Sequence, residues 1–155
     1  IVTIKLNNIF LIVEAELYDS GAFYMHISEK EIRDILAANP EILGEKFTTI
    51  DVEKKVEPGF IDLYLRDRKG NVVVVEIKRL TARVDAVRQL KKYINSLKSH
   101  MRTEKIRGII AAPSITKKAQ ELLLKEKLEF KQISIEALSK YAGKTEKKSL
   151  FDYLK

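Results

Sequence analysis

The chain has 155 residues, of which 45% are apolar and 33% charged, a balance typical of one folded domain and not of a disordered segment. Its formal net charge of +7 suits an anionic partner such as nucleic acid, and the lack of cysteine excludes disulfides, thiolate metal sites and cysteine nucleophiles. Because no apolar run is long enough to span a bilayer, we expect a soluble, cytoplasmic protein with no membrane partner.

The N-terminal third is predicted to contain strands and one helix. The first 20 residues read as strand. Residues 26–43 are predicted to be mainly helical, because Ser28 and Glu31 form a capping box and apolar residues then recur at helical spacing. Residues 48–56 alternate enough for an edge strand.

Two strands, residues 59–67 and 71–79, are predicted to form a hairpin. The three-residue loop between them ends at Gly70, where such loops favour a left-handed residue. The later elements are expected to be a helix over 81–99, a strand over 105–115, a helix over 116–127, a strand over 129–135 and a short helix over 135–142. This order predicts an α/β fold with a mixed central sheet flanked by helices.

The hairpin carries the first candidate site. If the loop residues are unpaired, Asp62 lies opposite Glu76, and Lys78 follows two positions later on the same face. Two carboxylates at that distance repel, so cations should lie between them; Lys78 supplies one, and Mg²⁺, which takes carboxylate oxygens, would supply the rest. A metal held there would polarise a phosphate and acidify a bound water, while Lys78 orients the water or neutralises developing charge. This set suits phosphodiester hydrolysis.

The alternative interpretation is a solvated cross-strand network of charges at the strand ends, worth under about 1 kcal/mol. The following helix bears on the choice. Gln89 and Tyr93 lie on one face of that helix, four residues apart. Core packing alone would account for Tyr93, but a buried amide such as Gln89 needs partners.

The segments "GFID", "EIK" and "QLKKY" together resemble the PD-(D/E)xK nucleases of the RecB-like branch. The longer run from "SEKEIRDILAANPEIL" to "RGIIAAPSIT" is similar to the C-terminal catalytic domain of the archaeal NucS family, also called EndoMS. The resemblance implies a restriction-endonuclease-like fold and a Mg²⁺- or Mn²⁺-dependent DNA endonuclease that cuts branched, flap or mismatched DNA in repair. The residues it implies are Asp62 and Glu76 as metal ligands, the Ile77 carbonyl as a third ligand, Lys78 as the catalytic lysine, Gln89 and Tyr93 as supports, and Glu29 as the helical glutamate, with Glu31 as its alternative.

The resemblance also suggests a division of the chain. Residues 1–20 would be a strand or linker remnant of an N-terminal domain that dimerises and grips DNA, residues 21–143 the nuclease domain, and residues 144–155 a flexible tail. The candidates for DNA-backbone contacts are Arg79, Arg83, Lys91 and Lys92. For the two lysines, a solvated helix face is an equal alternative.

The tail adds a possible partner. Leu150, Tyr153 and Leu154 would share one side of a helical turn, and the pattern resembles the PCNA-interacting peptide that docks on sliding clamps. The alternative is a C-terminal turn docked on its own domain. Two rival functions also stay open: a Holliday-junction resolvase or restriction-type nuclease, and a DNA- or clamp-binding module without catalysis.

Overall fold

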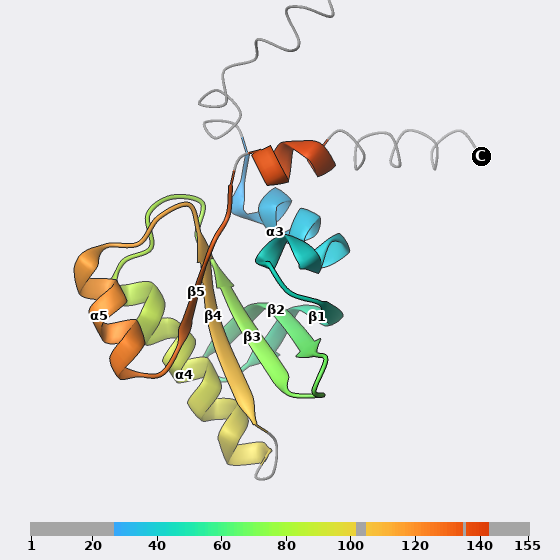
Figure 1. The fold of residues 1–155 in the computed structure, drawn as a ribbon. Coiled ribbons are helices and arrows are strands. Elements are labelled where there is room, and N and C mark those ends of the chain that lie inside the picture. The colour runs from blue at the N-terminus through green and yellow to red at the C-terminus, as the bar shows by residue number, and fades with distance from the viewer. Residues whose placement is uncertain (1–26, 102–104, 135, 143–155) are drawn as a thin grey trace, which may run out of the picture.

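The computed structural model describes residues 27–101, 105–134 and 136–142 (Figure 1). Its elements, in chain order, are α3 (Glu29–Ala38), the 3-10 helix η1 (Pro40–Leu43), β1 (Phe47–Val56), β2 (Gly59–Asp67), β3 (Val72–Ile77), α4 (Val84–His100), β4 (Ile106–Ala112), α5 (Lys117–Lys125) and β5 (Glu129–Gln132). Residues 136–142 are also helical.

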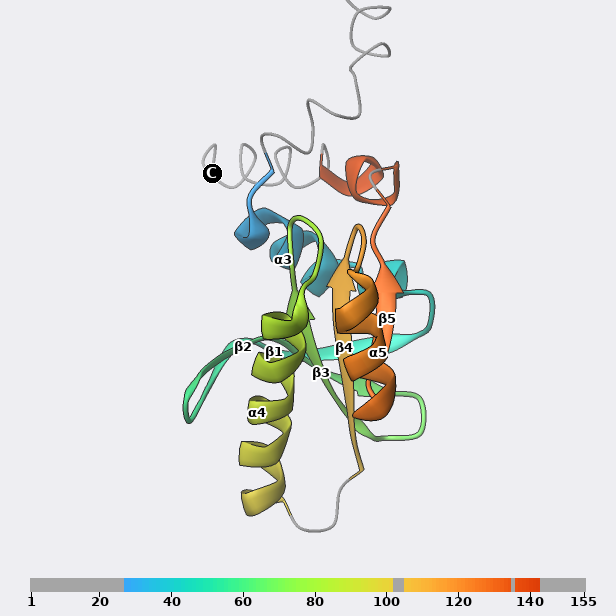
Figure 2. The ribbon, with the colours of Figure 1, turned by 90° about the vertical axis from the view of Figure 1, so that its left-hand side faces the viewer.

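The five strands form one mixed sheet in the order β1-β2-β3-β4-β5. β1, β2 and β3 form an antiparallel meander, and β3, β4 and β5 run parallel. α4 and α5 connect the parallel strands, and right-handed crossovers place both helices on the same face of the sheet. Figure 2 shows α4 and α5 in front of the sheet, and α3 lies on the other side in Figure 1. The predicted α/β fold is therefore confirmed.

Two apolar cores lie on the two faces of the sheet, and β3 contributes to both. Val72 and Val74 pack with α4 and α5, whereas Val73 and Val75 pack with α3. All four valines are fully buried. A strand covered on both faces requires a continuous apolar run and not an alternating one, which explains the four consecutive valines.

The hairpin has the predicted pairing between its strands. Arg66 pairs with Val72, and the ladder continues to Leu63 opposite Val75. Gly70 has φ +81°, the left-handed conformation expected at the end of the loop. The loop thus fixes which β2 residues face which β3 residues.

Some boundaries differ from the sequence-based expectation. β3 ends at Ile77, so Lys78 lies in the following loop. β5 ends at Gln132 instead of residue 135. The expected segments 1–20 and 144–155 lie outside the described residues. In the part of the chain that the structure describes, no helix is long and apolar enough to cross a membrane.

A charge network fastens the loop end of the hairpin to its neighbours. Arg107 on β4 donates to Glu45, Asp67 and Glu129 at 2.7–3.1 Å. Asp67 is the last residue of β2, and its side chain is only 6% exposed. This network lies at the opposite end of β3 from Glu76 and Lys78.

Candidate nuclease site

Asp62 and Glu76 lie at the end of the hairpin away from the loop. We expected Asp62 to pair directly with Glu76, but the ladder stops one pair earlier, at Leu63 and Val75. Instead, Asp62 Oδ2 accepts a hydrogen bond from the Ile77 N–H at 2.8 Å. The Asp62 carboxylate therefore satisfies an amide of β3 and is held beside the end of that strand.

Glu76 and Lys78 form a direct ion pair. Lys78 Nζ lies 2.9 Å from Glu76 Oε1, as expected for side chains two positions apart on one face. Glu76 is only 2% exposed, and its second oxygen, Oε2, has no hydrogen-bond partner among the described residues. A buried carboxylate oxygen without a donor is costly, so this atom is suited to bind a cation.

The electrostatics of the site reflect two carboxylates close together. Burial, and then the charge of Asp62, raise the pKa of Glu76 to about 7. Burial also raises the pKa of Asp62, outweighing the hydrogen bond from Ile77. Burial alone would lower the pKa of Lys78, but its hydrogen bond to Glu76 outweighs this and raises it. The two carboxylates thus disfavour each other's ionisation, and a cation between them would relieve this repulsion.

Of the two glutamates considered in the first turn of α3, Glu29 lies at the site. Its Oε1 accepts from the Arg79 N–H at 3.3 Å, and its charge acts on Asp62, Glu76 and Lys78. Glu31 instead completes the capping box, accepting from the Ser28 N–H at 2.7 Å. These bonds from Ser28 lower the pKa of Glu31.

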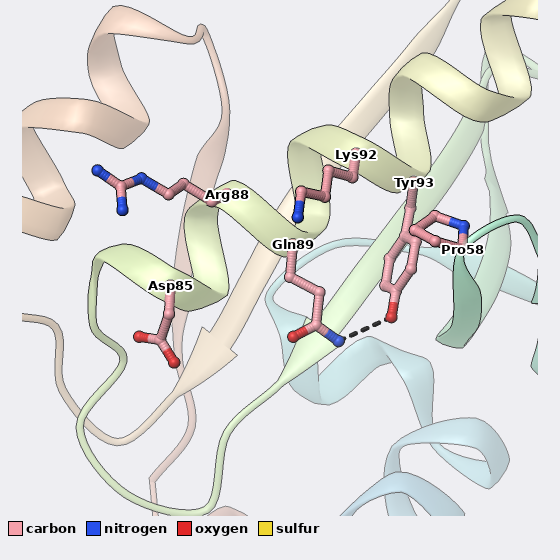
Figure 3. A pocket seen from close by; sticks show the side chains of 6 residues that line it. All are labelled: Pro58, Asp85, Arg88, Gln89, Lys92 and Tyr93. Atoms are coloured by element: carbon pink, nitrogen blue, oxygen red, sulfur yellow. Dashed lines mark hydrogen bonds between the residues drawn. The ribbon is translucent and has the colours of Figure 1, made fainter.

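Gln89 and Tyr93 line an open cleft of about 460 Å³ on α4, together with Pro58, Asp85, Arg88 and Lys92 (Figure 3). Gln89 Nε2 donates to Tyr93 Oη at 2.7 Å, as the dashed line shows. Tyr93 reaches the start of β2, where a Cβ at Gly59 would lie 3.0 Å from its hydroxyl oxygen. The buried ring also packs in the core, so Tyr93 serves both the packing and the cleft.

Gln89 makes no hydrogen bond to Asp62, Glu76 or Lys78 in the described part of the chain. Its link to the site is indirect, through the Tyr93 hydroxyl that lies beside the start of β2.

The four candidate DNA contacts have different surroundings. The Arg79 N–H bonds to Glu29 at the site, and Arg83 is the exposed N-cap of α4. Lys92 is exposed and lines the cleft, whereas Lys91 forms an ion pair with Glu126 on the α5 side. The two lysines therefore face different surroundings, which the sequence did not distinguish.

Two basic residues near the site were missed by the sequence analysis. Arg88 lies one turn before Lys92 on α4 and lines the same cleft. Arg33 lies one turn after Glu29 on α3, and its charge acts on Asp62. Spacing of i, i+4 from an already chosen residue could have indicated both.

The donor set fits one hard divalent cation. Asp62 and Glu76 supply carboxylate oxygens, Glu76 Oε2 lacks a partner, and the Ile77 carbonyl belongs to the same strand end. In the described residues, no three His, Cys, Asp or Glu side chains are grouped closely enough to hold a metal. Mg²⁺ commonly uses one or two carboxylates and completes its shell with water, so two are sufficient.

Comparison with known proteins identifies the family. The sequence model described as the endonuclease NucS C-terminal domain matches residues 28–151. Endonuclease NucS of Aeropyrum pernix is 34% identical, and the match covers 99% of this chain and 58% of the relative. Endonuclease NucS of Thermococcus kodakarensis is 36% identical, and the match covers 84% of this chain and 51% of the relative. The chain thus spans about half the length of the curated relatives it matches.

Solved structures give the same result. A crystal structure of a repair endonuclease from Pyrococcus abyssi matches with a TM-score of 0.65 and 41% sequence identity. The match covers 70% of this chain and 48% of the chain in that structure. A structure of an EndoMS–dsDNA complex matches with a TM-score of 0.65 and 41% sequence identity, and the match covers 69% of this chain and 44% of the protein chain in that structure. On this evidence, the chain belongs to the endonuclease NucS C-terminal domain family.

Proposed function

We propose that this chain is the catalytic domain of a Mg²⁺- or Mn²⁺-dependent DNA endonuclease. The observation that carries the proposal is a pair of carboxylates, the buried Glu76 and the half-buried Asp62, near Lys78, with one Glu76 oxygen unpartnered. Family membership supports the same reaction class, and a solved relative is an EndoMS–dsDNA complex.

Asp62, Glu76 and the Ile77 carbonyl would hold the metal ion. When bound, a divalent cation polarises a phosphate oxygen and lowers the pKa of a coordinated water. Asp62 is already oriented for this role, because the Ile77 N–H fixes one of its oxygens. Glu76 is oriented by Lys78 in the same way, which leaves its Oε2 for the cation.

Lys78 is in direct contact with Glu76, one of the two proposed acidic ligands, and its charge also acts on Asp62. It stays protonated because the Glu76 contact raises its pKa. A charged ammonium at this position can donate a hydrogen bond to the attacking water or to a phosphate oxygen as negative charge develops there. Glu29, whose charge acts on Asp62, Glu76 and Lys78, would help to orient the same water.

The α4 cleft is the proposed path of the DNA backbone. Arg88 and Lys92 are exposed at its rim, and Gln89 lies between them on the helix. Arg79 and Arg83 precede α4 on the loop that leaves the site. Phosphate contacts from these cations would hold the strand across the carboxylates without reading its sequence.

Longer-range partners are part of the proposal. The tail residues Leu150, Tyr153 and Leu154 would dock on a sliding clamp (PCNA), and the longer protein would act as a homodimer. A clamp contact would raise the local concentration of the nuclease on DNA. The tail lies outside the described residues, so only its sequence pattern supports the proposed clamp contact.

The proposal is tested with end-labelled duplex, mismatched, flap and junction DNA. Each substrate is incubated with the purified chain in Mg²⁺, in Mn²⁺ and with a chelator. We expect cleavage only with a metal, and preference for one substrate would separate a repair nuclease from a junction resolvase. Binding of all four substrates without cleavage under any condition would favour the non-catalytic DNA-binding alternative.

A further inference from the structure

β1 is distorted directly beside Asp62. The β1–β2 ladder pairs Val52 with Leu63 and Lys54 with Ile61, but the intervening pair, Glu53 with Asp62, is missing. Glu53 has φ +50°, a left-handed conformation that a residue with a side chain adopts only at a cost. The unpaired position thus coincides with a proposed metal ligand.

The distortion changes the direction of side chains on β2. In a regular strand, residues two apart share a face. Ile61, however, packs in the core under α4, and Leu63 packs in the core under α3. The strand therefore turns at Asp62, and in this turned position the carboxylate bonds to the Ile77 N–H instead of lying opposite Glu76.

Arg33 anchors the distorted residue. It projects from α3, is only 8% exposed, and donates from Nη1 to Glu53 Oε1 at 2.8 Å. Its Nε lies 4.0 Å from Asp34, too far for a hydrogen bond, and has no hydrogen-bond partner within the described residues. A buried guanidinium that is incompletely bonded weakens the core, so stability alone does not explain this residue.

From these contacts, we propose that the Arg33–Glu53 ion pair is a positioning device for Asp62. By holding Glu53 in its left-handed conformation, Arg33 keeps β1 from pairing with Asp62 and so leaves the Asp62 carboxylate turned toward Ile77. Arg33 is a positioning residue and not a catalytic one. The inference takes Asp62 as a metal ligand from the proposed function, but the geometry it describes exists without metal.

The test uses the Ile77 amide as a reporter, because its hydrogen-bond acceptor is the Asp62 carboxylate. Amide hydrogen exchange is followed by NMR in the metal-free full chain, with the Val73 amide as internal reference. Arg33→Met removes the anchor and should make Ile77 exchange about tenfold faster relative to Val73. Glu53→Val, which disfavours a positive φ and also removes the anchor, should do the same.

A suppressor separates positioning from a general loss of stability. Glycine adopts a positive φ without strain, so Glu53→Gly in the Arg33→Met background should restore Ile77 exchange to within about threefold of the wild type. Arg107→Met, which breaks an ion network at the far end of the hairpin, is the matched control and should not raise the Ile77-to-Val73 ratio. Unchanged Ile77 exchange in Arg33→Met, or failure of Glu53→Gly to restore it, would overturn the proposal.

Calorimetric titration with Mn²⁺ provides the second readout. Loss of a positive charge alone would tighten Mn²⁺ binding, whereas misplacement of Asp62 should weaken it by about tenfold in Arg33→Met. Tighter binding in Arg33→Met would contradict positioning. Absence of Mn²⁺ binding by the wild type would contradict the proposed function, and the Ile77 result would still decide the positioning inference.

Discussion

Asp67 provides a stability prediction that can be worked out from the structure. Burial alone would raise the pKa of its carboxyl, but hydrogen bonds from Asn71, Arg107 and Lys69 outweigh this and lower it to about 2. The ordinary value is 3.8. This lowering corresponds to roughly 2 kcal/mol of stability, and the side chain is only 6% exposed, so solvent screens the interaction little.

The sign follows from the direction of the pKa change. A carboxyl group whose folded-state pKa is lowered stabilises the fold above its unfolded pKa, and this contribution is lost as the pH falls through the folded pKa. Asp67→Asn should therefore lower the free energy of unfolding by about 2 kcal/mol at pH 7, and by about 1 kcal/mol at pH 3. The stability difference between wild type and variant should stay constant from pH 7 to about pH 5 and narrow only as the pH falls below the ordinary pKa of 3.8.

Urea unfolding measures this difference. At a slope of about 2 kcal/mol per molar, the midpoint for Asp67→Asn should lie about 1 M below the wild type at pH 7 and approach it at low pH. A midpoint difference that stays constant from pH 7 to pH 3 would refute the assignment of Asp67 as an ionised, strongly bonded group.

Two further predictions concern binding. The double substitution Arg88→Gln with Lys92→Gln should reduce the slope of log DNA affinity against log salt concentration by up to about two units. Lys91→Gln should leave this slope unchanged, because Lys91 pairs with Glu126. An equal change of slope in the double variant and in Lys91→Gln would place the DNA elsewhere. Leu150→Ala with Tyr153→Ala should abolish micromolar binding of the chain to an archaeal-type sliding clamp, measured by calorimetry. Failure of the unaltered chain to bind would favour the docked-turn interpretation of the tail.

The sequence was sufficient to predict most of the hairpin, because its determinants are local. Gly70 fixes the loop, the loop fixes the pairing of Leu63 with Val75, and period-two alternation brings Glu76 and Lys78 together. The capping box likewise assigned Glu31 to the helix end and left Glu29 for the site, and the structure has this arrangement.

The features that were missed depend on contacts between distant segments. Arg33 lies in a helix whose pattern predicts only apolar burial, and its partner Glu53 is twenty positions away. No local signal indicates that Glu53 adopts a positive φ, so the turn of β2 at Asp62 could not be foreseen. The ion pair of Lys91 also depends on a distant residue, because its partner Glu126 lies thirty-five positions away.

The single-turnover cleavage rate of labelled DNA in Mg²⁺ tests most directly whether Asp62 and Lys78 form a nuclease site. Asp62→Ala, which removes a proposed metal ligand, should abolish cleavage. Lys78→Ala should lower the rate by at least about a hundredfold, because it removes an electrostatic stabiliser of the reaction, and DNA binding should persist in both variants. Asp51→Ala, which removes a carboxylate on β1 paired with Lys54, is the matched control and should cut at the wild-type rate. Cleavage by Asp62→Ala at the wild-type rate would contradict the assignment of Asp62 as a metal ligand.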